Sequence, residues 1–367
     1  MHRLLRLTAL LICLCVVARA DSKEKRYLYL SSPDGAQSEG RSGNAILVFD
    51  IDNRHQFVRR IEISSFKEGL RGFTANARTH RIYYSTTNRR LGCFDLETDK
   101  VVWERQYDAG CDRSSVTPDG AKIYVPTGWW SRMTNSGLLV INAASGEVMK
   151  RVPVGPQAHN SLVSLDGQFA FLGTETNLTV FRTSDDSLAR TISGVGEFGV
   201  FPFTIDSKNH FAYVCLGKHV GFDVVDVQNG QVPHRVLAGE TPIAHRTHGA
   251  ALTPDESELW ISDQEGKQLF IFDAAQMPPK PKDRIDLSMG GHGWICFSLD
   301  GRYAWCHTPD VIDARTKKIV ATLKDETGKP VCSSKFIEVQ FRDGKVVEVG
   351  NEFGLGRVHT ASQPGLR

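Results

Sequence analysis

The chain has 367 residues, and its 44 lysines and arginines nearly balance its 42 aspartates and glutamates. A net charge of +2 at pH 7 creates no field strong enough to hold nucleic acid or an anionic membrane surface, so we expect neither as a partner. The length exceeds what one compact core usually holds, which favours several domains or an array of repeats.

The N-terminus has the three parts of a secretory signal peptide. Met1 to Arg6 contains two arginines, Leu7 to Ala18 is apolar, and Ala18-Arg19-Ala20 matches a small-x-small cleavage site. The apolar run is too short to cross a bilayer as a helix, and no other stretch approaches that length, so we expect no membrane span. Residues 1–20 are therefore predicted to be removed, and residues 21–367 to work in the periplasm or outside the cell.

Six cysteines remain after this cleavage, none of them in a CxxC spacing. An oxidising compartment permits disulfides, and Cys296 and Cys306 flank one predicted hairpin. Buried free thiols that pack as small hydrophobic side chains are the alternative.

The rest of the chain repeats one unit about every 45 residues. Its clearest copy, residues 245–273, has three short apolar runs separated by turn residues, and each run has the length of a strand. An aromatic residue marks the centre of the second run in every copy. These markers are Tyr29, Tyr83, Tyr124, Phe171, Tyr213, Trp260 and Trp305.

A second marker, a polar residue that ends the third run, repeats in step with the first. It falls at Asp50, Asp95, Asn142, Arg182, Asp226, Asp273 and Asp313, and a fourth run closes most units. Four short strands at this period are typical of propeller blades. The sequence thus predicts an all-β protein, a seven-bladed β-propeller of four-stranded antiparallel blades that fills residues 21–367.

The two ends of the array predict how the ring closes. The first unit starts at Tyr27 with its second run, whereas residues 335–341 and 345–349 form two spare runs at the C-terminus. We expect one of these to complete the first blade, because this removes an exposed sheet edge. The alternative is a C-terminal hairpin packed under the ring.

The segment from Thr253-Pro-Asp through Trp260-Ile-Ser to Phe272-Asp resembles the YVTN-type β-propeller repeat, with weaker copies at 298–313 and 117–142. The resemblance covers essentially all of the mature chain and implies the fold of the WD40/YVTN-like propellers. It leaves function open, since similar propellers include lactone hydrolases, cofactor-bearing oxidoreductase subunits and binding proteins.

In a propeller, the loop that leads into each innermost strand lies on the same face as the loop between the second and third strands. These loops contain residues able to bind an anionic ligand at the channel mouth. They are Arg71, Arg113, His159, Arg246, His248, His292 and Trp294.

Register brings several of these side chains to equivalent places around the axis. The turn between the first and second runs contains an aspartate in four units, at Asp119, Asp166, Asp255 and Asp300. Asp112, His159 and His248 stand seven residues before the first three of these, and His292 stands eight before the fourth. Converging imidazoles suit a transition metal, with His159, His248 and His292 as ligands. The arrangement resembles in part the copper-binding propeller of nitrous oxide reductase, although this chain has fewer histidines. The alternatives are histidines that hydrogen-bond between blades, and arginines that pair with acids such as Asp112 or Glu240.

Two further features bear on function. Trp129 and Trp130 are adjacent in the longest loop of the third blade, where aromatic side chains favour contact with a partner, or a lid over their own blade.

Lactone hydrolysis would need a histidine beside a carboxylate, such as His248 or His292 with Glu197 or Asp112, but no Gly-x-Ser-x-Gly or His-Glu-x-x-His motif occurs.

We therefore expect a monomeric secreted or periplasmic binding or scaffold protein, whose small anionic ligand or protein partner contacts the face described above. The alternative is a metal- or cofactor-dependent periplasmic enzyme or enzyme subunit, oxidoreductase-like or lactonase-like, that uses the same histidines.

Overall fold

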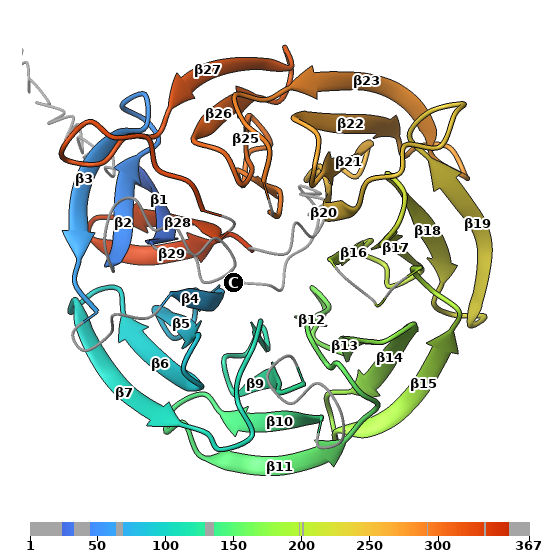
Figure 1. Cartoon of the computed structure of the whole chain (residues 1–367). Helices are drawn as coiled ribbons and strands as arrows, with labels where there is room; N and C mark the ends of the chain where they lie inside the picture. Colours follow the sequence, from blue (N-terminus) through green and yellow to red (C-terminus); the bar gives the residue numbers. More distant parts are fainter. Residues whose placement is uncertain are drawn as a thin grey trace, which may run out of the picture.

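The computed structural model describes residues 24–32, 45–63, 69–128, 136–197, 199, 202–291, 293–333 and 335–351. In these ranges the chain forms seven antiparallel sheets, arranged as a ring around a central axis (Figure 1). Six sheets have four strands and one has five, and the described residues contain no helix. The prediction of a seven-bladed propeller is confirmed.

Four strands of every sheet occupy successive positions from the axis outward, and the five-stranded sheet has one additional strand on the free side of its first. The innermost strands are β28 (Phe336–Arg342), β4 (Leu70–Asn76), β8 (Ser115–Val116), β12 (Ser161–Val163), β16 (Phe203–Ile205), β20 (Thr247–Leu252) and β24 (Cys296–Phe297). The second strands are β1 (Glu24–Ser32), β5 (Arg81–Thr86), β9 (Lys122–Pro126), β13 (Phe169–Thr174), β17 (Phe211–Cys215), β21 (Glu258–Asp263) and β25 (Tyr303–Trp305).

The third strands are β2 (Ala45–Asp50), β6 (Arg90–Asp95), β10 (Gly137–Asn142), β14 (Asn177–Arg182), β18 (Gly221–Asp226), β22 (Gln268–Asp273) and β26 (Asp310–Asp313). The outermost strands are β3 (Gln56–Ile61), β7 (Lys100–Gln106), β11 (Val148–Pro153), β15 (Ser187–Ser193), β19 (Gln231–Leu237), β23 (Lys280–Asp286) and β27 (Lys318–Thr322). We number the blades 1 to 7 in the order of these four lists.

Blade 1 closes the ring with strands from both ends of the chain. β28 pairs antiparallel with β1, from Glu24 opposite Arg342 to Leu30 opposite Phe336. The other C-terminal run also joins this sheet, as a fifth strand β29 (Lys345–Val349) on the free side of β28. The prediction that a C-terminal strand completes the first blade is confirmed. Without β28, β1 would present a row of unpaired backbone N–H and C=O groups.

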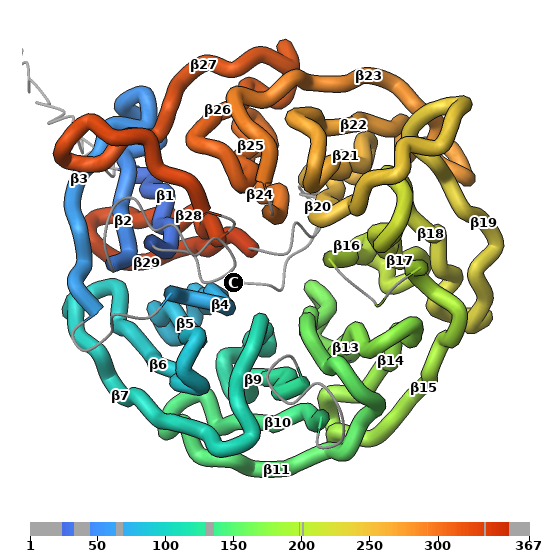
Figure 2. The backbone as a smooth tube through the Cα atoms, viewed as in Figure 1, coloured from blue at the N-terminus to red at the C-terminus, as the bar shows by residue number. Residues whose placement is uncertain are grey.

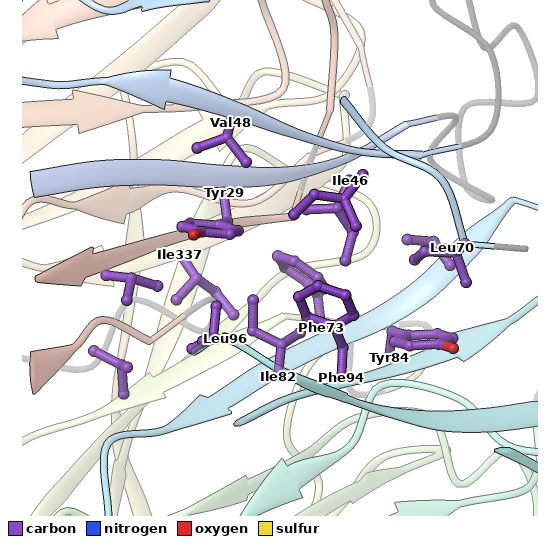
Figure 3. Close-up of a cluster of buried hydrophobic side chains, with 14 of the residues drawn as sticks. Tyr29, Ile46, Val48, Leu70, Phe73, Ile82, Tyr84, Phe94, Leu96 and Ile337 are labelled. Atoms are coloured by element: carbon purple, nitrogen blue, oxygen red, sulfur yellow. The ribbon is translucent and has the colours of Figure 1, made fainter. Parts of the chain in front are cut away.

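The hydrophobic core lies between the blades. All seven predicted aromatic markers sit in the second strands and are at most 3% exposed. In the cluster of Figure 3, Tyr29 and Val48 of blade 1 pack against Phe73 and Ile82 of blade 2. Each blade has an apolar surface on both sides, and a ring buries both at once, which explains why the second and third runs are almost continuously apolar.

The predicted turn between the first and second strands has one recurring hydrogen-bond pattern. In blade 4, Ser164 Oγ donates to Asp166 Oδ1 at 2.6 Å and accepts from the Phe169 N–H at 3.0 Å. Gly167 has a φ of +73°, a conformation that favours glycine. Thr253 and Asp255 repeat the pair in blade 6 at 2.6 Å. These turns connect the first and second strands of each blade in the same way, so equivalent residues of different blades lie at equivalent places around the axis.

The six described cysteines are free thiols. Cys296 and Cys306 are not bonded to each other: the Cys296 thiol donates to the Phe336 carbonyl oxygen, and the Cys306 thiol contacts the Thr308 hydroxyl. Burial raises the pKa of Cys215 to about 12 and that of Cys306 to about 11, so both thiols stay protonated at neutral pH.

The predicted signal peptide, residues 1–20, lies outside the described residues. The described part of the chain also has no helix with the length and hydropathy that a membrane crossing requires.

Candidate functional site

Strand direction places two sets of loops on one face of the ring. Successive strands of a blade are antiparallel, so the loop into the innermost strand and the loop between the second and third strands lie at the same end of the blade. We call the first set the lead-in loops and this side the lead-in face. Figure 2 shows the innermost strands around the centre, so the described parts of the lead-in loops run toward the axis.

Three charged or polar side chains from successive blades form a buried network beside the axis. Arg71 of β4 donates from Nη2 and Nε to Asp112 Oδ1 at 3.0 and 3.1 Å. His159 Nδ1 lies 2.6 Å from Asp112 Oδ2. Asp112 is fully buried, and the other two side chains are nearly so. The three loops of blades 2, 3 and 4 are thus tied together at one carboxylate.

Electrostatics fixes the charge states of this network. Burial alone would raise the pKa of Asp112, but the charge of Arg71 and the contact with His159 hold it far below its usual range. Burial lowers the pKa of His159, so at neutral pH the imidazole is neutral and its Nδ1–H donates to the carboxylate. Such an anionic, fully paired Asp112 is a poor proton acceptor, which argues against its use as a general base.

A second group of side chains spans the channel. The Arg113 guanidinium of blade 3 lies 4.4 Å from the ring centroid of Trp294, which leads into blade 7. His248 of blade 6 meets the same indole edge to face, with the ring centroids 6.5 Å apart. Trp294 also packs with Leu162 and Phe203 of blades 4 and 5. Because these residues come from opposite sides of the ring and are at most 1% exposed, their side chains fill the channel at this level.

Around this filled centre, half-exposed histidines pair with carboxylates on the lead-in face. His219 Nδ1 lies 2.7 Å from Glu197 Oε1 in blade 5, and His245 Nδ1 lies 3.0 Å from Asp263 Oδ2 in blade 6. The hydrogen bond with Asp263 raises the pKa of His245. Arg246 is partly exposed beside this pair, and its backbone N–H donates to Glu265 Oε2 at 2.7 Å.

The structure thus separates the predicted ligand-binding residues into three places. Arg71 and His159 meet at Asp112, whereas Arg113, His248 and Trp294 meet across the channel. Arg246 lies among the half-exposed side chains around the filled centre, a region of the lead-in face that we call the rim. For the arginines, the sequence also offered pairing with an acid such as Asp112 as an alternative to ligand binding, and Arg71 forms this pair. His292, Trp129 and Trp130 lie outside the described residues.

The predicted metal ligands do not form a group among the described residues. His159 and His248 belong to the two different networks above, and His292 is not described. The group of described His, Cys, Asp and Glu side chains that could share an ion is His245, Asp263 and Glu265, whose ligand atoms lie within 4.8 Å of one another. The sequence predicts that the two loops containing these residues lie on one face, but the contact between the side chains depends on the pairing of β20 with β21.

One hollow was not anticipated from the sequence. A cavity of about 480 Å³ opens between the outer strands β7 and β11 and is lined by Arg105, Tyr107 and Arg151 among others. Its charges are matched within the cavity wall, because Arg151 lies 3.6 Å from Asp108 and Arg105 lies 3.9 Å from Glu147. This pairing leaves the cavity without a net excess of either charge.

Comparison with known proteins identifies the fold and no closer relationship. No family model and no curated protein matches the chain, so the YVTN-type resemblance of its repeats stays a prediction. Among solved structures, the chain is similar to hydrazine synthase from Kuenenia stuttgartiensis, with a TM-score of 0.57 and 17% identity over 69% of this chain and 79% of that one. It is also similar to the dihydro-heme d1 dehydrogenase NirN in complex with DHE, with a TM-score of 0.55 and 14% identity over 87% of this chain and 75% of that one. At this level of identity the likeness extends to the architecture alone, and the chain is an all-β, seven-bladed propeller.

Proposed function

We propose that this protein is a secreted or periplasmic binding or scaffold propeller whose partner docks on the lead-in face. One observation carries the proposal: the side chains at the axis are buried and in contact with one another, whereas charged side chains around them are partly exposed. A small ligand would need to displace the stacked Arg113 and Trp294 to enter the channel. A protein partner can instead lie across the face and contact the rim.

The rim has the residue types that protein interfaces use. Arg246 lies in the lead-in loop of blade 6 and is partly exposed, and arginine is enriched at interface positions that dominate binding energy. We propose that Trp129 and Trp130 add apolar contact area to the same interface. In this arrangement the buried residues at the axis support the interface without touching the partner. Their contacts hold the lead-in loops of five blades in fixed positions; these residues are Arg71, His159, Arg113, His248 and Trp294.

A charge reversal on each face of the ring tests this proposal. The mature protein is immobilised, exposed to an envelope extract of its source organism, and the retained proteins are quantified by mass spectrometry. We expect Arg246→Glu to reduce retention of the specific partner by at least about tenfold, since the loss of an arginine that dominates an interface costs about 2 kcal/mol or more. Arg315→Glu reverses an exposed charge in the turn between β26 and β27, on the opposite face, and should leave retention unchanged.

The result has three informative outcomes. Equal loss in both variants would mean that net charge controls retention, and no loss in either would remove Arg246 from the interface. Tight binding of citrate or inorganic phosphate, abolished by Arg246→Glu, would replace the protein partner with a small anion.

A metal- or cofactor-dependent enzyme subunit is the second candidate, and the histidine–carboxylate pairs of the lead-in face favour it over a chemically inert surface. The two similar solved structures also have enzyme names. Metal content of the protein purified from a periplasmic fraction tests this candidate. A stoichiometric transition metal that disappears in the His248→Ala, His292→Ala double variant, with the fold retained, would favour it over the binding propeller.

A further inference from the structure

The rim of blade 6 gathers one imidazole and two carboxylates from loops that are close only in the folded chain. His245 precedes β20, Asp263 ends β21, and Glu265 lies in the turn before β22. Their potential ligand atoms all lie within 4.8 Å of one another. Asp263 is almost fully buried, whereas the His245 side chain is 43% exposed, so the group is open to solvent on one side.

Backbone N–H groups hold one oxygen of each carboxylate in place. Asp263 Oδ1 accepts from the N–H groups of Glu265 and Gly266 at 3.1 and 2.7 Å. His245 Nδ1 faces both oxygens of this carboxylate, with Oδ2 at 3.0 Å and Oδ1 at 3.2 Å. Glu265 Oε2 accepts from the Arg246 N–H at 2.7 Å. Backbone donors of this kind orient the ligands of known metal sites.

A glycine makes room for the oxygen that faces His245. A Cβ atom added to Gly266 would lie 2.2 Å from Asp263 Oδ2, far inside van der Waals contact. Any side chain at this position would therefore push the carboxylate out of its present place. The turn between β21 and β22 is thus built around the orientation of the Asp263 carboxylate.

The closest pair of ligand atoms, His245 Nδ1 and Asp263 Oδ2, lies at hydrogen-bond distance, and the same distance also fits two neighbouring positions of an octahedral shell. Two ligands that are each about 2.1 Å from a metal and 3.0 Å from one another subtend about 90° at the ion, whereas a tetrahedral angle would separate them by about 3.4 Å. The His245–Asp263 distance therefore matches neighbouring positions of an octahedron. One imidazole with two carboxylates suits divalent first-row ions better than Ca²⁺, which prefers oxygen ligands throughout.

We propose that His245, Asp263 and Glu265 form a site for a six-coordinate divalent transition-metal ion of the zinc or manganese class, with water completing the shell. The ion would take the place of the proton shared by His245 and Asp263, and it would join the two loops of blade 6 next to Arg246. This site is separate from the predicted histidine set, and the proposal does not depend on the lead-in face being a docking surface.

Titration with Zn²⁺ and Mn²⁺ alone tests the site in the mature protein after treatment with a chelator. We expect one equivalent to bind, seen by calorimetry and by equilibrium dialysis, and no binding of Ca²⁺ under the same conditions. Asp263→Asn, Glu265→Gln and Gly266→Ala should each weaken Zn²⁺ binding by at least about tenfold. His219→Gln alters the comparable pair in blade 5, which has no third ligand within reach among the described residues, and should bind Zn²⁺ as the unaltered protein does.

A second measurement separates this site from adventitious binding to surface histidines. Co²⁺ in an octahedral shell has weak visible absorption, whereas tetrahedral Co²⁺ absorbs strongly, so the bound Co²⁺ should give the weak spectrum. Thermal unfolding of the metal-free variants shows that each is folded. The proposal is overturned if Zn²⁺ and Mn²⁺ fail to bind, if His219→Gln weakens binding as much as Asp263→Asn does, or if the Co²⁺ spectrum is tetrahedral.

Discussion

Replacing Asp112 with alanine should lower the free energy of unfolding by about 3–5 kcal/mol, because it leaves buried charged and polar groups without their partner. The carboxylate is fully buried and neutralises Arg71, which is itself nearly inaccessible to water. It also accepts the short hydrogen bond from His159. Its removal would uncouple the lead-in loops of blades 2, 3 and 4 in one step.

Urea denaturation at pH 7, followed by circular dichroism, measures this effect. The matched control is Glu326→Gln, which breaks the bidentate pair of Glu326 with Arg60 on the surface. A solvent-exposed pair contributes no more than about 1 kcal/mol. Asp112→Asn should fall between the two variants, since it keeps the shape of the side chain and loses its charge. Equal stability of Asp112→Ala and Glu326→Gln would show that the buried network contributes nothing beyond a surface pair.

The free energy of unfolding should decrease as the pH falls from about 6.5 to about 4, with two buried histidines responsible for much of the change. Burial lowers the pKa of both His55 and His307 to about 4. Between about pH 4 and the ordinary pKa of about 6.5, each of these histidines binds more protons in the unfolded chain than in the folded chain. Their contribution to the free energy of unfolding is therefore fully present above about pH 6.5 and decreases on acidification. For a shift of this size, each histidine accounts for about 2 kcal/mol at pH 5.

Both histidines are tightly packed, so a second proton would place a charge where little water reaches it. His55 packs edge to face against Tyr303 and Trp305, with centroid distances of 4.8 and 5.7 Å. His307 is packed against Gly293, where an added Cβ atom would lie 1.9 Å from the His307 Cβ. Burial raises the pKa values of Asp206, Glu256 and Glu338. These carboxyl groups stabilise the folded state as the pH falls, which offsets part of the stability that is lost through the histidines.

Comparison of denaturation at pH 7 and pH 5 tests this assignment. His55→Asn removes the titrating ring and suits the φ of +56° at this position, which asparagine tolerates. His55→Asn and His307→Asn should each reduce the stability difference between the two pH values by about 2 kcal/mol. Ser193→Ala, at an exposed position of β15, should leave that difference unchanged. The assignment fails if both histidine variants keep the full difference.

Local patterns in the sequence were sufficient to predict the architecture. The aromatic marker of each unit, such as Tyr83 or Trp260, is apolar because both faces of the second strand are covered in the ring. Turns such as Ser164 to Gly167 depend on hydrogen bonds within a few residues, so their residue types are visible in a short window. Ring closure by β28 was also predictable, because the first unit lacks an innermost strand of its own and a spare run exists at the other end.

Only the tertiary structure decided which side chains near the axis meet. The register correctly placed Asp112 and His159 at equivalent positions of neighbouring blades, and these two residues, 47 positions apart, are in contact. His248 has the same register but meets Trp294, and Arg113 reaches that indole from across the ring. Register specifies where a backbone enters the channel, whereas the side-chain contacts depend on rotamers and on neighbours far away in the chain. The same reason applies to His245, Asp263 and Glu265: the sequence placed them on one face, and the pairing of β20 with β21 brought them within reach of one ion.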